Sequence, residues 1–134
     1  MAPVIKPFHR PRLWLGAWLL LVAIVIVLSL TPPPPLPPLP SGTDKVEHFL
    51  AYFVLAAGAV QGFAARRTQF SIGVGLIALG ALLEVAQASL TVTRMMDLHD
   101  AIANALGVLV GLITTVSSWH DFALRLDQRR RGNL

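Results

Sequence analysis

Four long apolar stretches, separated by short polar connections, dominate the chain. They cover approximately residues 13–30, 45–65, 70–90 and 98–119. Crossing a hydrocarbon layer of roughly 30 Å takes about 20 helical residues. Helices satisfy their backbone polar groups internally, and these stretches lack the strict apolar/polar alternation of barrel strands. The pattern therefore predicts an all-α fold, an integral membrane bundle of four transmembrane helices that forms a single domain over residues 1–134.

Composition also indicates a membrane protein. Hydrophobic residues make up 54% of the chain, charged residues 13%, and the mean hydropathy is +0.64, which is too apolar for an ordinary soluble domain. Cysteine is absent, so disulfides, thiolate metal sites and cysteine nucleophiles are excluded. The first apolar stretch is longer than the core of a secretory signal peptide, and "SLTPPPP" after it offers no Ala-x-Ala cleavage site. We expect an uncleaved anchor.

Basic residues predict the orientation, because they stay on the cytoplasmic side of short membrane loops. Nine of the eleven lie near the chain ends or between the second and third stretches: Lys6, Arg10, Arg12, Arg66, Arg67, Arg125, Arg129, Arg130 and Arg131. Lys45 and Arg94 fall on the other side. We therefore expect a multi-pass protein of the cell inner (cytoplasmic) membrane with both termini cytoplasmic. Topology then explains the pI of about 10.7 with no nucleic-acid partner.

Two polar segments adjoin the apolar stretches. Residues 31–40, "TPPPPLPPLP", hold most of the prolines and predict an extended spacer on the outer side of the membrane. Residues 120–134 predict a basic cytoplasmic tail that lies on the inner membrane surface as a short helix. After the spacer, "SGTDKVEH" predicts a helix start capped by Ser41, Thr43 or Asp44.

Polar residues recur at helical spacing near the outer ends of the last three helices. Asp44, His48 and Tyr52 share one face of the second helix, and Glu84 and Gln87 share a face of the third. The fourth starts with Asp97, Asp100 and Asn104 at steps of three and four residues. By helix rise these groups lie at a similar depth, and ionisable groups in membranes face the bundle interior. We predict one outward-facing binding pocket formed by Asp44, Lys45, His48, Tyr52, Glu84, Gln87, Arg94, Asp97, Asp100 and Asn104.

Carboxylates outnumber cations in this predicted pocket, so it favours cations, protons or bound hydroxyls. Arg94, on the turn above Glu84, is the expected counter-ion of that carboxylate. A purely structural interpretation stays open for several members. Asp97 and Asp100 could be helix caps, and Gln87 and Asn104 could join helices by hydrogen bonds. The glycine pairs that favour close helix packing are Gly58/Gly62 and Gly107/Gly111.

Three separated motifs carry a family resemblance: "DKVEHFLAYF", "LEVAQ" and the run from Arg94 to Gly111. In order and spacing they resemble the VanZ-like family of small bacterial membrane proteins. "TVT" stands before Arg94 where that family often has a proline. The resemblance implies a role in the cell envelope and, for the family's namesake, antibiotic resistance of the glycopeptide (teicoplanin) type. It brings no settled reaction.

Three functions remain open from the sequence. The first is binding or handling the head group of an envelope lipid or lipid-linked glycan, with phosphate held by Lys45 and Arg94. The second is an enzyme acting on such a lipid, with His48, Glu84 and Asp100 as candidate catalytic acid–base groups. The third is a proton-coupled carrier or scaffold subunit, possible as a homodimer. No zincin, nucleophile-elbow or phosphate-loop motif is present. We expect no cofactor and no metal, although Asp, His and Glu side chains can ligate a cation.

Overall fold

The structure, a computed structural model, describes residues 3–32, 37, 40–90 and 96–131. Within these residues the chain forms five α-helices and a 3₁₀ turn: α1 (Pro11–Leu30), α2 (Thr43–Gly62), α3 (Arg66–Leu90), α4 (Leu98–Ile113), η1 (Thr114–Val116) and α5 (Phe122–Arg131). Among the described residues the remaining regular element is a single isolated β-bridge. The predicted all-α fold is confirmed.

Three of the described helices are long and apolar enough to cross a membrane. They are Pro11–Leu30, Arg66–Leu90 and the continuous stretch Leu98–Val116. α2 is as long as α1, at 20 residues each, but its first two turns carry Asp44, Lys45, Glu47 and His48. These charges lower its apolarity, so the fourth predicted span stays a prediction.

Several predicted helix boundaries were wrong by a few residues. α2 ends at Gly62, α3 already begins at Arg66, and α4 gives way to the 3₁₀ turn after Ile113. The predicted side-chain cap of α2 is also wrong. Its N-cap is Gly42, at φ 86°, with no side-chain hydrogen bond. The hydroxyl of Thr43 instead donates to Pro40 O.

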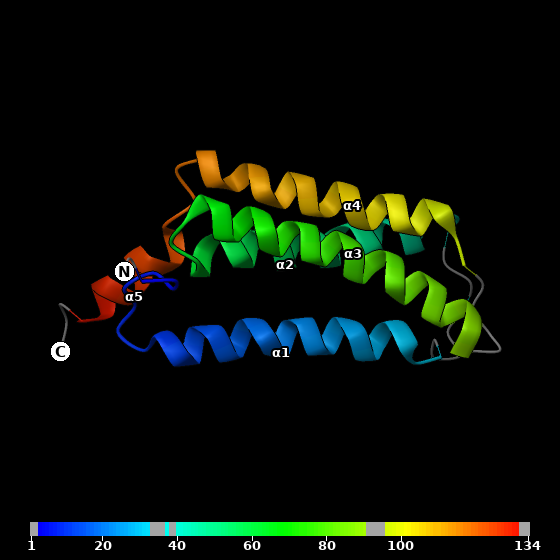
Figure 1. Ribbon diagram of the computed structural model, residues 1–134, viewed down its shortest axis with the longest axis horizontal. Coiled ribbons are helices and arrows are strands. Elements are labelled where there is room, and N and C mark those ends of the chain that lie inside the picture. Colours follow the sequence, from blue (N-terminus) through cyan, green and yellow to red (C-terminus); the bar gives the residue numbers. More distant parts are fainter. Residues whose placement is uncertain (1–2, 33–36, 38–39, 91–95, 132–134) are drawn as a thin grey trace.

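Helices α2, α3 and α4 pack together, and α1 lies along one side of them (Figure 1). α1 has no buried residue and is held by a few specific contacts. Trp18 Nε1 donates to Leu55 O at 2.9 Å, and the same ring fills the space beside Gly58. Near the other end of α1, Gln87 Nε2 donates to Ser29 O at 2.8 Å. α1 therefore presents most of its surface to the surroundings, as suits a helix in lipid.

The closest helix pair is α2 and α4, which meet at two glycines. A Cβ at Gly107 would collide with the backbone of Phe49, and one at Gly111 would lie 2.7 Å from Phe53 O. Small residues at a four-residue spacing let helix backbones approach in this way. This packing fixes the side chains on the first turns of both helices relative to one another.

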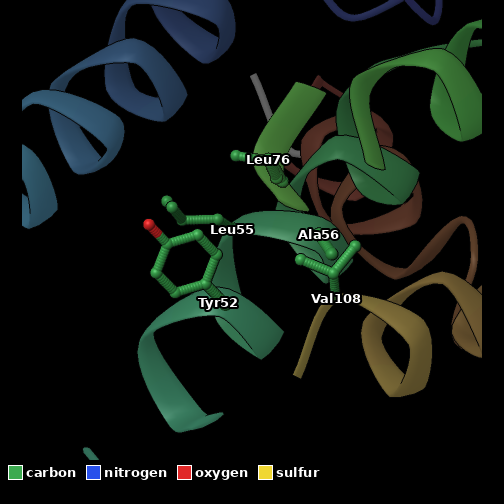
Figure 2. Close-up of a cluster of buried hydrophobic side chains, with 5 residues drawn as sticks. All are labelled: Tyr52, Leu55, Ala56, Leu76 and Val108. Atoms are coloured by element: carbon green, nitrogen blue, oxygen red, sulfur yellow. The ribbon is translucent and has the colours of Figure 1, made fainter. Parts of the chain in front are cut away.

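A buried apolar cluster lies next to this contact. It joins α2, α3 and α4 and consists of Tyr52, Leu55, Ala56, Leu76 and Val108 (Figure 2). Each of these side chains is at most 4% exposed. Tyr52 is the member nearest the start of α2, so the apolar cluster lies directly beyond the polar residues in the first two turns of that helix.

The other end of the bundle is joined by the terminal segments. The bridge pairs Ile5 with Phe63, in the connection between α2 and α3. Lys6 is buried and its Nζ forms an ion pair with Asp121 at 2.9 Å. Both described terminal segments thus lie at one end of the bundle, away from the start of α2 (Figure 1). The tail forms the predicted short helix, α5, whose location on a membrane surface stays a prediction.

Candidate functional site

Polar side chains from three helices meet at the bundle end opposite to the terminal segments. They come from the first two turns of α2, the last two turns of α3 and the start of α4. We call this group the polar cluster; its members are Asp44, Lys45, His48, Glu84, Asp97, Asp100 and Asn104. Helix spacing places the members of each helix on one face, and the α2–α4 glycine contact brings the faces together.

Lys45 lies at the open side of the polar cluster, among three carboxylates. Its Nζ is 2.9 Å from Asp44 Oδ2, 2.9 Å from Asp97 Oδ2 and 3.0 Å from Asp100 Oδ1. The ammonium group has three donors, and all three are directed at these oxygens. The phosphate-binding role expected from the sequence would require Lys45 to give up these contacts.

His48 lies at the centre of the cluster. Its Nδ1 is 3.1 Å from Asn104 Oδ1 and 3.7 Å from Glu84 Oε1. Its Nε2 is 3.7 Å from Asp100 Oδ2. The imidazole therefore lies between two carboxylates from different helices, with Asn104 available to orient the ring.

Glu84 forms the buried end of the cluster. Its side chain is 3% exposed. Oε2 receives a long hydrogen bond from the Asp97 N–H at 3.5 Å. Among the residues that the structure describes, Oε1 has no hydrogen-bond partner. A buried carboxylate oxygen without a partner is costly, which makes this atom the least satisfied part of the site.

Tyr52 and Gln87, two other predicted pocket residues, are not counted in the polar cluster because their main contacts are elsewhere. Tyr52 belongs to the apolar cluster, and its hydroxyl has no hydrogen-bond partner among the described residues. Gln87 donates to Ser29 O and so joins α3 to α1, which matches its structural interpretation. Arg94, the expected counter-ion of Glu84, lies outside the described residues.

The two aspartates of α4 have different roles. Asp97 is the N-cap and accepts from the His99 N–H at 2.8 Å. The hydrogen bond from Lys45, followed by those from His99, lowers the pKa of Asp97 to about 2. Asp100 instead directs one oxygen at Lys45 and the other at His48. The capping interpretation therefore holds for Asp97 and is wrong for Asp100.

Exposure falls steadily across the polar cluster. The exposed fraction of the side chain is 56% at Asp44, 35% at Lys45, 16% at His48 and 3% at Glu84. With His48 neutral, four carboxylates face one ammonium group, a formal charge of −3. The cluster thus opens to the surroundings at one side, ends in a buried carboxylate, and attracts cations and hydrogen-bond donors.

Two sets of side chains in the cluster have the spacing of metal ligands. One ligand atom each from His48, Glu84 and Asp100 lie within 4.8 Å of one another, and so do atoms from Asp44, Asp97 and Asp100. The sequence alone indicates cation-binding residue types but not these two ligand sets, because helix spacing does not fix which helix faces meet.

A separate apolar cavity of about 200 Å³ lies between α1 and the second half of α2. Its lining includes Trp14, Trp18, Gly58 and Phe63 and no member of the polar cluster. The cavity is therefore a different feature from the candidate site.

Comparisons with protein-family models, curated proteins and solved structures found no match to this chain.

Proposed function

We propose that this chain is a VanZ-like protein of the bacterial cell envelope that binds the head group of an envelope lipid or lipid-linked glycan in its polar cluster. In this proposal α2 is the fourth transmembrane helix, the cluster faces outward and both termini are cytoplasmic. The link to glycopeptide tolerance comes from the resemblance of the sequence motifs.

The observation that carries the proposal is the graded exposure of the polar cluster. The polar cluster is exposed at Asp44 and Lys45 and buried at Glu84. This gradient suits a ligand that enters from the membrane surface. Carboxylate and amide oxygens accept hydrogen bonds from hydroxyl and ammonium groups. Since Lys45 is already surrounded by carboxylates, the preferred ligand part is a sugar or amine, and any phosphate lies outside the cluster.

The location of α2 supports four spans. It packs against both α3 and α4, because its buried Leu55 and Ala56 belong to one cluster with Leu76 and Val108, so it shares their environment. Its charged first turn lies where the cluster opens, at the depth where polar groups contact lipid head groups. The nine basic residues of the other end then lie on the cytoplasmic side.

Native mass spectrometry of the purified protein tests the proposal. Wild type should retain a lipid with a glycan or amine head group. Asp100→Asn, which removes a charge shared with Lys45 and His48, should lose that lipid and keep its thermal stability. Glu47→Gln is the matched control, because Glu47 is exposed and outside the cluster. Equal lipid retention in all three proteins would refute the proposal.

A second function, an enzyme acting on the same class of lipid, is favoured by one observation. His48 lies 3.7 Å from carboxylates on both sides, just beyond hydrogen-bond distance, and contacts of this kind between acid–base groups tighten when a substrate binds. Conversion of a bound envelope lipid by wild type, and its loss in His48→Gln with the lipid still retained, would support the enzyme over the binding protein.

A further inference from the structure

The buried end of the polar cluster has the composition of a metal site. We propose that His48, Glu84 and Asp100 bind one divalent transition-metal ion of the Zn²⁺ type. One imidazole nitrogen and two carboxylate oxygens suit such an ion, and catalytic zinc sites commonly use three protein ligands. This inference goes beyond head-group binding and stands without it.

The spacing of the ligand atoms fits a single ion. Two ligands of a four-coordinate zinc ion, each at about 2.1 Å, lie roughly 3.5 Å apart. His48 Nε2 and Asp100 Oδ2 are 3.7 Å apart, and one ligand atom from each of the three residues lies within 4.8 Å of the others. Glu84 Oε1 lies 3.7 Å from the other ring nitrogen, Nδ1, so the Glu84 side chain has to turn toward Nε2 to complete the set.

Glu84 gives independent evidence that a ligand belongs here. Its side chain is 3% exposed, and Oε1 is directed toward His48 Nδ1 at 3.7 Å, beyond hydrogen-bond distance. No described residue donates a hydrogen bond to that oxygen. A bound cation would supply the missing partner and offset the cost of burying the charge.

Asn104 prepares His48 for ligation. Asn104 is 2% exposed, and its Oδ1 lies 3.1 Å from His48 Nδ1. When Nδ1–H donates to this amide, the Nε2 lone pair faces Asp100. Metal-binding histidines usually donate their second N–H in this way, which fixes the ring and its tautomer.

Charge distinguishes the group His48, Glu84 and Asp100 from the neighbouring acidic group. Glu84 and Asp100 together carry −2, which a divalent ion neutralises. The other acidic group, Asp44, Asp97 and Asp100, already surrounds the Lys45 ammonium at 2.9–3.0 Å. Lys45 occupies the position that a cation would take there, so the inner group is the one that requires an ion.

A metal titration of the purified full chain tests the site. The protein, freed of metal by a chelator that is then removed, should bind one Co²⁺ per chain with a visible absorption band that Zn²⁺ abolishes. Glu84→Gln and His48→Gln should each weaken binding at least tenfold, whereas Glu47→Gln on the exposed side of α2 should bind like wild type. Absence of stoichiometric binding by wild type, or equal weakening in Glu47→Gln and Glu84→Gln, would overturn the site.

Lipid retention, measured on the same preparations before and after chelation, distinguishes this proposal from the proposed function. Metal binding without retained lipid would support the metal site and refute head-group binding. Retained lipid with no Co²⁺ or Zn²⁺ binding would refute the metal site alone.

Discussion

Replacing Gly107 with alanine tests the contact that assembles the polar cluster. The added Cβ would collide with Phe49 O and lie 3.1 Å from Phe49 C and 3.0 Å from Phe53 N. All three are backbone atoms of α2, so no side-chain rotation relieves the collision. α4 would have to move away from α2 by about 1 Å, since ordinary Cβ contacts lie beyond roughly 3.4 Å.

The change in the free energy of unfolding caused by Gly107→Ala is the difference between two opposing contributions. Overpacking costs about 1–3 kcal/mol, and a contact with rigid backbone belongs at the upper end. Alanine gains about 1 kcal/mol over glycine in a helix. We expect Gly107→Ala to lower the free energy of unfolding by about 2 kcal/mol. The Lys45–Asp100 and His48–Asn104 contacts, at 3.0 and 3.1 Å, join the same two helices and should weaken together with it.

Thermal unfolding in detergent, followed by circular dichroism, measures this change. Gly75→Ala is the matched control, because a Cβ at Gly75 meets nothing within 4 Å; it should keep or slightly raise the melting temperature. Equal melting of Gly107→Ala and Gly75→Ala would show that α2 and α4 are not in backbone contact, and the assembly of the cluster would need another explanation.

Three further predictions concern charge and orientation. Lys45 and His99 hold the folded-state pKa of Asp97 at about 2, below its ordinary 3.8. The stability that Asp97 contributes is therefore present above about pH 4 and is lost toward pH 2. Acid unfolding curves of wild type and Asp97→Asn should converge in that window, and parallel curves would contradict the pairing. Lys6→Met should lower the free energy of unfolding by about 1–3 kcal/mol, because Asp121 loses its partner at 2.9 Å. Arg12→Met, at an exposed position, should change the melting temperature little. Equal melting temperatures of the two variants would refute the Lys6 contact. In intact cells, cysteines at exposed Ser41 and His99 should react with a membrane-impermeant thiol reagent, and cysteines at exposed Ala65 and Ser118 should not; the reverse labelling would place the cluster on the cytoplasmic side.

The helices were predictable because apolar length and spacing act locally. The depth of the polar residues was also accessible from helix rise, which is why His48, Glu84 and Asp100 were placed at one level and are found in contact. The contacts that each polar side chain makes were harder to predict from the sequence. The sequence suggested a phosphate-binding Lys45, but the structure surrounds it with carboxylates, because its neighbour Asp44 and the acidic start of α4 lie on the same side. The predicted side-chain cap of α2 was wrong because Gly42, in a left-handed conformation, precedes the helix and no side chain caps it.

The separation of Lys6 from its partners along the chain has a consequence for the order of assembly. Lys6 Nζ donates to His120 O, 114 residues away. At typical synthesis rates of about 5–20 residues per second, roughly 6–23 s pass between the two on the ribosome. During that interval all the apolar helices have been made, while the ammonium group of Lys6 still lacks its partner and remains hydrated. Closure of this end of the bundle is therefore a late event, and a chain that stops before residue 120 would leave Lys6 with neither the His120 carbonyl nor the Asp121 carboxylate to receive it.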